Sequence, residues 1–233
     1  MTHTQNPSIK AIAFDAYGTL FDVFSVGALI ETFFPNKGAA AAITWRDKQI
    51  EYTRLRTMCD RYVDFWHVTE DALRFTAAFH ALDMQPEQFT ALMDQYAELA
   101  AFPENKHALT QLKEAGIPMA ILSNGTPKML QSALTSSGLT SFFDHVLSVE
   151  DVKQFKTAPA AYQLGPDAFR CDVNEILFVS SNCWDICGAS WFGYQTLWLN
   201  RYNHPLEELG PSPDHIGRAL TDVVEHTFML SSK

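Results

Sequence analysis

The sequence predicts an α/β fold in which a doubly wound parallel sheet carries an all-helical cap inserted after its first strand. Over most of the chain, short apolar runs that end in polar residues alternate with helical patterns, which is typical of parallel sheets covered by helices. One long stretch, residues 21–101, shows helical periodicity only. We therefore expect an α/β core domain formed by residues 1–20 and 102–233, and a helical cap domain formed by residues 21–101.

Four segments are predicted strands because each is a short apolar run of the kind that is buried on both faces: residues 9–14, 118–122, 176–179 and 196–199. The polar residues that follow these runs are Asp15, Ser123, Ser180 and Asn200. Ligands of doubly wound sheets bind beyond the carboxyl ends of the strands. These polar side chains are therefore expected to share one site.

The remaining patterns predict helices. Core helices are expected at residues 104–115, 128–137, 158–169 and 184–191, and three of these are closely followed by a glycine. Apolar periodicity within the insert predicts helices at residues 26–34, 43–58, 69–82 and 86–99. A loop rich in proline and glycine at 205–213 precedes a closing helix at 220–230.

The charge composition disfavours two classes of binding partner. The 233 residues carry a net charge of −10, from 17 basic and 27 acidic residues, and no Lys/Arg cluster, which disfavours nucleic acid and membrane surfaces as partners. No run approaches the roughly 20 apolar residues of a membrane span, and the first ten residues lack the apolar run of a signal peptide. The cysteines show no paired framework, so a reducing, cytoplasmic location is expected; they are Cys59, Cys171, Cys183 and Cys187.

The sharpest local signal is the run DAYGTL at residues 15–20. An aspartate that ends an apolar strand and precedes a tight, glycine-containing turn presents its carboxylate to the cleft, where backbone N–H groups of the turn can hold an anion. Such a carboxylate can act as a covalent nucleophile. The same residue type also caps turns without any catalytic role, and the run alone leaves both interpretations open.

This run resembles the first motif of the haloacid dehalogenase superfamily. Residues 121–125 (ILSNG) resemble the second motif, Lys156 within QFKTAP resembles the third, and residues 178–185 (FVSSNCWD) resemble the fourth. The resemblance covers essentially the whole chain, including the insert, which resembles the cap of that superfamily. It implies a Rossmann-like core and a hydrolase.

Two departures separate the chain from the phosphatases of that superfamily. Tyr17 stands where those enzymes carry a second aspartate, and Ser180 and Ser181 precede the single acid Asp185 in the fourth motif. Magnesium prefers oxygen ligand sets that include carboxylates, so a magnesium-dependent phosphatase is the alternative rather than the first interpretation. A non-catalytic binding protein is also disfavoured, because Asp15 and Lys156 are retained together with Asp185.

The fourth motif instead resembles that of the L-2-haloacid dehalogenases. This resemblance implies hydrolytic dehalogenation of short 2-haloacids to 2-hydroxyacids with inversion, through an aspartyl-ester intermediate on Asp15, with neither a metal nor an organic cofactor. Arg46 lies in the run WRDKQIEY, which resembles the segment that supplies an arginine to the site. Members of the family are commonly dimers, so the expected partners are the haloacid, water and a second copy of the chain.

Catalytic roles follow from the same resemblance. Asp15 is implied as the nucleophile, and Lys156 as the cation that lies near both carboxylates and keeps Asp15 ionised. Asp185 is expected to activate the water that hydrolyses the ester, and Tyr162 to support Lys156. The expected catalytic set is Asp15, Thr19, Arg46, Lys156, Ser180, Asn182 and Asp185.

Substrate contacts are implied in the same way. The departing halide carries negative charge and needs preorganised donors, for which the resemblance implies Arg46, Asn124 and Trp184. The substrate carboxylate is expected on the Ser123 hydroxyl and on backbone N–H groups near Ala16, Tyr17 and Asn124.

An apolar wall around the C2 substituent is expected from Tyr17, Phe65 and Ile50. The packing of the cap explains these three side chains equally well, and Arg46 taken alone is typical of a solvated helix charge. Only the joint placement of the polar residues at the strand ends favours a catalytic site.

Overall fold

The computed structural model describes residues 8–231 and contains a six-stranded sheet in the order β3-β2-β1-β4-β5-β6, with every neighbouring pair parallel. The doubly wound α/β class predicted from the sequence is therefore confirmed. From β1 the sheet is extended to one side by β2 and β3 and to the other side by β4, β5 and β6. The crevice between β1 and β4 is therefore the topological switch point, where such sheets bind ligands. The strands are β1 (Ala11–Phe14), β2 (Met119–Ser123), β3 (His145–Ser148), β4 (Ile176–Ser180), β5 (Gln195–Leu199) and β6 (His215–Gly217).

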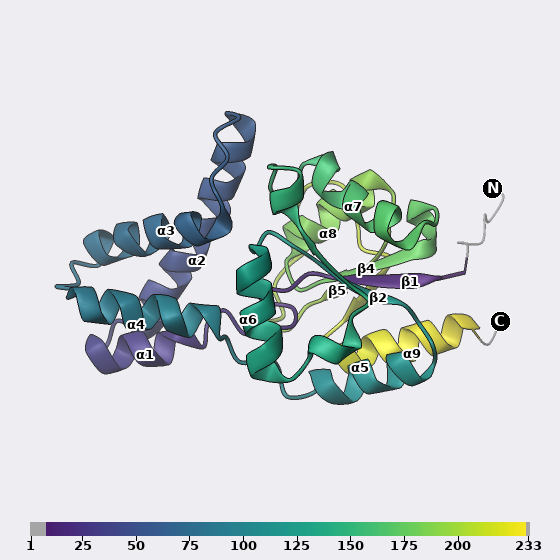
Figure 1. The fold of residues 1–233 in the computed structure, drawn as a ribbon, viewed down its shortest axis with the longest axis horizontal. Helices are drawn as coiled ribbons and strands as arrows, with labels where there is room; N and C mark the ends of the chain where they lie inside the picture. Colours follow the sequence, from purple (N-terminus) through teal and green to yellow (C-terminus); the bar gives the residue numbers. More distant parts are fainter. Residues whose placement is uncertain (1–7, 232–233) are drawn as a thin grey trace.

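Helices cover both faces of the sheet, with α7 and α8 on one face and α5, α6 and α9 on the other (Figure 1). Every residue of β1, β2, β4 and β5 is buried, which explains why these four strands read as apolar runs in the sequence. The core helices are α5 (Asn105–Glu114), α6 (Pro127–Ser137), α7 (Pro159–Phe169), α8 (Cys183–Phe192) and α9 (Leu220–Ser231). Short 3₁₀ turns occur at Thr140–Phe142, Val149–Asp151 and Val173–Glu175.

Sequence analysis did not predict β3 and β6. Both lie at the edges of the sheet, and in each strand only the last residue, Ser148 or Gly217, is buried. A short edge strand with one solvated face lacks the continuous apolar run by which the central strands were identified.

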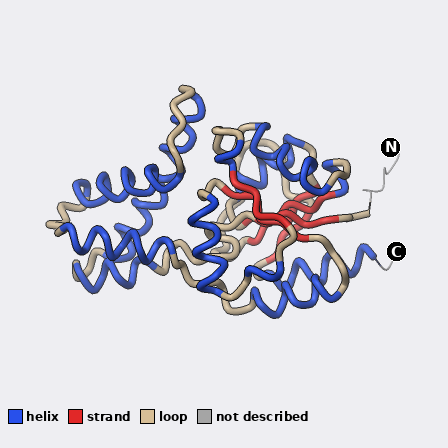
Figure 2. The backbone as a smooth tube through the Cα atoms, in the orientation of Figure 1, coloured by secondary structure: helices blue, strands red, loops and turns tan. Residues whose placement is uncertain are grey.

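The insert after β1 contains four helices: α1 (Val26–Phe33), α2 (Gly38–Met58), α3 (Phe65–Phe79) and α4 (Pro86–Ala97). They form a group beside the sheet, on the left in Figures 1 and 2. The helix α3 begins four residues before the predicted start, because the Asp64 side chain accepts a hydrogen bond from the His67 backbone and caps it. Among the described helices, none has the length and apolar content needed to cross a membrane.

The two connections between this helical group and the sheet run side by side. The backbone N–H of Asp22 donates to Ala100 O at 2.9 Å, and that of Phe102 donates to Leu20 O at 3.1 Å. Both connecting segments lie next to the turn that follows β1, so the helical group is attached to the core close to Asp15. Division of the chain into two domains at residues 20/21 and 101/102 stays a prediction.

Candidate active site

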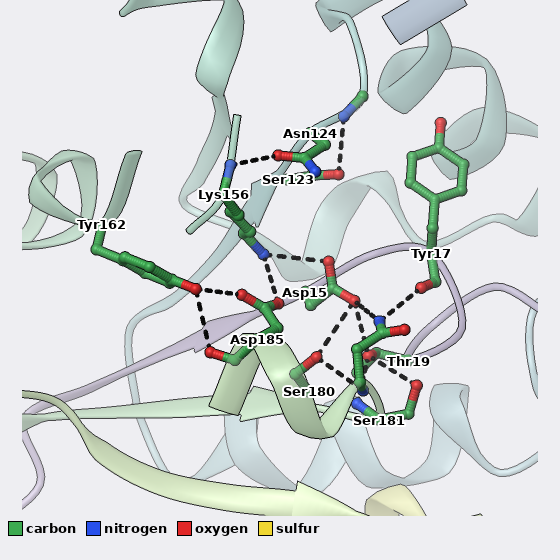
Figure 3. A network of polar contacts seen from close by, with 12 residues as sticks. Asp15, Tyr17, Thr19, Ser123, Asn124, Lys156, Tyr162, Ser180, Ser181 and Asp185 are labelled. Atoms are coloured by element: carbon green, nitrogen blue, oxygen red, sulfur yellow. Dashed lines mark hydrogen bonds and ion pairs between the residues drawn. The ribbon is translucent and has the colours of Figure 1, made fainter. Parts of the chain in front are cut away.

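Asp15 follows β1 at the reversal point of the sheet and is only 6% exposed. Its Oδ1 accepts a hydrogen bond from Lys156 Nζ at 3.1 Å (Figure 3). Its Oδ2 accepts from Asn182 Nδ2 at 2.9 Å, from the Thr19 hydroxyl at 3.0 Å and from the Ser180 hydroxyl at 3.4 Å. Three neutral donors therefore hold Oδ2, whereas the charged ammonium is the donor to Oδ1.

Lys156 joins two buried carboxylates. Its Nζ lies 3.1 Å from Asp15 Oδ1 and 2.9 Å from Asp185 Oδ2, and its side chain is 1% exposed. The Tyr162 hydroxyl donates to Asp185 Oδ1 at 2.7 Å, so each oxygen of Asp185 has a donor. Burial raises the pKa of Asp185 while the neighbouring Lys156 opposes that rise. A charge this deeply buried is tolerated only when it is paired, and here one cation serves two anions.

The turn after β1 interlocks with the segment after β4. The Ser181 backbone donates to the Thr19 hydroxyl at 2.8 Å, and the Asn182 backbone donates to the Ser180 hydroxyl at 3.1 Å. Gly18 has φ +93°, and a Cβ at that position would lie 3.1 Å from Ser181 Oγ. Glycine therefore meets both the backbone conformation and the close approach of the two segments.

Arg46 comes from the middle of α2 and reaches the same site. Its Nη2 donates to the Tyr17 carbonyl at 3.1 Å and to Asn182 Oδ1 at 3.3 Å. The Asn182 amide thus contacts Arg46 through its oxygen and Asp15 through its nitrogen. A charge on a helix of the insert is in this way fixed within the site at the strand ends.

A small cavity lies beside Asp15, with a volume of about 10 Å³, which suits about one water molecule. The Tyr17 ring forms part of its wall and packs against Phe65 and Tyr96, with ring centroids 5.5 and 5.7 Å away. Burial raises the pKa of Tyr17 well above its usual value, so this phenol stays neutral. The residues that line the cavity are Asp15, Tyr17, Arg46, Ile50, Thr53, Phe65, Asn124 and Trp184.

Most residues singled out from the sequence thus lie together, but two of them have local backbone partners. Ser123 is fully buried, and its hydroxyl accepts from the Gly125 backbone at 3.1 Å. The Ala16 carbonyl accepts from three backbone N–H groups of the turn, at Thr19, Leu20 and Phe21. Their contacts to a substrate carboxylate, like the other assigned roles, stay predictions.

Sequence reasoning missed several neighbours of the site. Thr53 lines the cavity and lies seven residues after Arg46, so helical spacing places both on one face of α2. Ser181 lies within the fourth motif and was not given a role. The Tyr96 hydroxyl donates to Gln49 behind Tyr17 at 3.2 Å, a buried contact between α4 and α2 that no local pattern indicates.

The two carboxylates of the site pair with the Lys156 ammonium. Within the described part of the chain, no group of three or more His, Cys, Asp or Glu side chains is arranged to hold a metal. The space between the carboxylates of Asp15 and Asp185 is filled by the Lys156 ammonium. Arg46 is the cation that lines the cavity itself, together with the polar side chains of Thr53 and Asn124 and with apolar and aromatic side chains.

Comparison with known proteins agrees with this geometry. Residues 9–193 match the family model for haloacid dehalogenase-like hydrolases. An (S)-2-haloacid dehalogenase from Pseudomonas sp. (strain YL) is 46% identical over 217 residues, which cover 93% of this chain and 94% of the relative. The crystal structure of the L-2-haloacid dehalogenase RSc1362 has a TM-score of 0.94 and 50% identity, covering 95% of this chain and all of that chain (100%).

A second solved structure, an L-2-haloacid dehalogenase from Xanthobacter autotrophicus with chloropropionic acid covalently bound, has a TM-score of 0.88 and 35% identity. It covers 93% of this chain and 97% of that chain. These similarities extend over the sheet and the helical insert alike. The chain belongs to the haloacid dehalogenase-like hydrolase family and, within it, to the L-2-haloacid dehalogenases.

Proposed function

We propose that the chain is an (S)-2-haloacid dehalogenase that converts short 2-haloacids and water into 2-hydroxyacids with inversion at C2. The observation that carries the proposal is the buried carboxylate of Asp15, held by four donors beside a small cavity that Arg46 and Asn124 line together with apolar side chains. An anionic substrate with a short apolar substituent suits such a cavity. Relatives that carry this name, and a similar structure with chloropropionic acid covalently bound, support the same assignment.

In the first step, Asp15 Oδ1 attacks C2 of the haloacid. A C–O bond forms on one face of the carbon while the carbon–halogen bond breaks on the opposite face, and the halide leaves with the bonding electrons. Oδ1 is the better attacking atom because Oδ2 already accepts three hydrogen bonds. Arg46, Asn124 and Trp184 line the cavity and are proposed to stabilise the departing halide.

Lys156 supports this step by offsetting the charge of the buried Asp15 carboxylate, whose Oδ1 lies 3.1 Å from Lys156 Nζ. Without that cation, the carboxylates of Asp15 and Asp185 would share a buried site with no counter-charge between them, which is strongly unfavourable.

In the second step, water attacks the Cγ carbon of the Asp15 ester. Asp185 takes a proton from the water, because burial raises its pKa and makes it a stronger base than a solvated aspartate. The intermediate collapses, the departing 2-hydroxyacid takes up that proton, and the regenerated carboxyl of Asp15 loses its own proton to solvent. Thr19, Ser180 and Asn182 keep Asp15 in position during both steps.

The proposed reaction uses neither a metal nor an organic cofactor. A magnesium-dependent phosphatase, the alternative weighed from the sequence, needs a carboxylate where this chain has the Tyr17 ring, packed against Phe65 and Tyr96. The two carboxylates that remain both pair with Lys156, whose ammonium lies between them.

The proposed partners are the haloacid, water and a second copy of the chain, with neither nucleic acid nor a membrane. Exposed apolar side chains on α2 and α3 support the homodimer: Ile43 and Phe79 are 52% and 66% exposed. The four cysteines are free thiols, which supports a cytoplasmic location.

Halide release tests the proposed function. Chloroacetate, fluoroacetate and both enantiomers of 2-chloropropionate are incubated with the protein, with Asp15→Asn as the inactive control. We expect chloride from the (S)-enantiomer with formation of (R)-lactate, and little from the (R)-enantiomer. Absence of halide from every substrate, or a product of retained configuration, contradicts the proposal.

A further inference from the structure

Two side chains of the small cavity also line both hollows on the outside of the molecule. Ile50 and Trp184 line the cavity beside Asp15, and both also line two outer hollows of about 290 and 530 Å³. Ile50 belongs to α2 of the insert, and Trp184 to the first turn of α8 in the core. The pair therefore comes from both parts of the chain.

Arg54 lies beside this pair of side chains. It follows Ile50 by four residues on α2, so both side chains share one face of the helix. Its guanidinium carbon lies 5.0 Å from the centroid of the Trp184 ring, a cation–π contact between insert and core. Arg54 also lines the larger hollow and, among the ion pairs between described residues, takes part in none.

The cavity is too small for a substrate in the observed arrangement. A volume of about 10 Å³ suits one water molecule, whereas even propionate contains five heavy atoms besides the halogen. Because protein interiors are close-packed, the cavity can become larger only if side chains that line it are displaced. Trp184 and Ile50 line both outer hollows, whereas Arg46, which lines only the smaller one, is held by hydrogen bonds to Tyr17 and Asn182. Trp184 and Ile50 are therefore the wall residues that can move outward. For Trp184 that movement breaks the contact with Arg54.

We propose that Arg54 is a positioning residue that holds Trp184 over the cavity and thereby restricts the size of the substituent at C2. The inference rests on the proposed dehalogenase function and adds a determinant of chain-length preference to it. A longer substituent requires a larger displacement of Trp184 and so a greater loss of the Arg54 contact. Haloacids with a short substituent are therefore favoured.

Competition between two substrates with the same leaving group tests the proposal. The ratio of kcat/KM for (S)-2-bromohexanoate to that for (S)-2-bromopropionate is measured for the natural chain and for Arg54→Met and Arg54→Gln. Both variants remove the cation from an exposed position, so failure of one to fold leaves the other. Loss of a positive charge weakens attraction of both anionic substrates equally, and the ratio removes that effect.

Arg74→Met is the matched control. Arg74 is also exposed on the insert and stacks on Phe89 with its guanidinium carbon 4.6 Å from the ring centroid, but Phe89 is not a wall of the cavity. We expect the ratio to rise about two- to fivefold in both Arg54 variants, the size of an exposed cation–π contact, and to stay unchanged in Arg74→Met.

An unchanged ratio in both Arg54 variants, or an equal rise in Arg74→Met, overturns the proposal. These outcomes are distinct from failure of the proposed function. If the natural chain releases bromide from (S)-2-bromopropionate and only the ratio fails to move, the dehalogenase assignment stands and the role of Arg54 is wrong. If the natural chain releases no bromide from either acid, both are wrong.

Discussion

Replacing Lys156 by methionine removes the cation that two buried carboxylates share. Methionine keeps most of the side-chain volume, so the change is chiefly electrostatic. The side chains of Asp15 and Asp185 are 8% and 0% exposed, so neither carboxylate can regain hydration by rotating toward solvent. Breaking a buried ion pair by removing one partner costs about 3–5 kcal/mol. We expect the free energy of unfolding of Lys156→Met to fall by about that amount near pH 7.5.

The loss should depend on pH in a defined direction. Burial raises the pKa of Asp185, and Lys156 opposes that rise, so removing Lys156 raises this pKa further. A carboxyl group whose pKa is higher in the folded than in the unfolded state destabilises the fold at a pH above its unfolded value, about 3.9. Below that value both states are protonated and the penalty disappears. The deficit of Lys156→Met should therefore shrink as the pH falls toward about 4.

Urea unfolding of the natural chain and the variant, followed by circular dichroism at about pH 7.5 and about pH 5, measures both effects. Lys106→Met serves as the control, because Lys106 is exposed on α5 and surface substitutions change stability by about 0.5 kcal/mol or less. A loss below about 1 kcal/mol for Lys156→Met at the higher pH, or an equal loss at both pH values, refutes the reasoning.

Three further predictions concern the chemistry. Arg46→Ala should slow ester formation about 10²–10³-fold because the halide loses a donor, and rapid quench measures that rate; slowed ester hydrolysis alone would give Arg46 a different role. Asp185→Asn should accumulate the ester, seen by mass spectrometry as an Asp15 peptide heavier by the dehalogenated acid; a variant that never accumulates it would place Asp185 with Lys156 in the first step. Chelators should leave halide release unchanged, since Tyr17 replaces the acidic residue that a magnesium-dependent phosphatase needs; a loss restored by magnesium would contradict this.

The fold could be predicted where the burial of an element produces a simple pattern of apolar residues in the sequence. β1 and β4 are buried on both faces, so each appears as an apolar run that stops where the chain enters the site. Asp15 and Ser180 could be placed at the strand ends for that reason alone. Edge strand β6 has two exposed residues out of three and offers no such signal. Its pairing with β5 is a tertiary contact that only the structure gives.

The candidate site was predictable only in part from local patterns. Lys156 contacts Asp15 across 141 residues of sequence and Asp185 across 29, and the resemblance to a family, rather than any periodicity, pointed to it. Thr53 had a usable signal in its helical spacing from Arg46, which was overlooked. The stacking of Arg54 on Trp184 had none, because it depends on how the insert packs against the core.

The covalent role of Asp15 is the central claim, and a single turnover in ¹⁸O-labelled water tests it most directly. Enzyme in excess over (S)-2-chloropropionate converts all substrate in one cycle, after which the lactate and the Asp15 peptide are analysed by mass spectrometry. The product oxygen comes from the Asp15 carboxylate, and water later replaces it there. We predict label in Asp15 and almost none in the lactate. Label entering the lactate directly in that first turnover would contradict the ester mechanism.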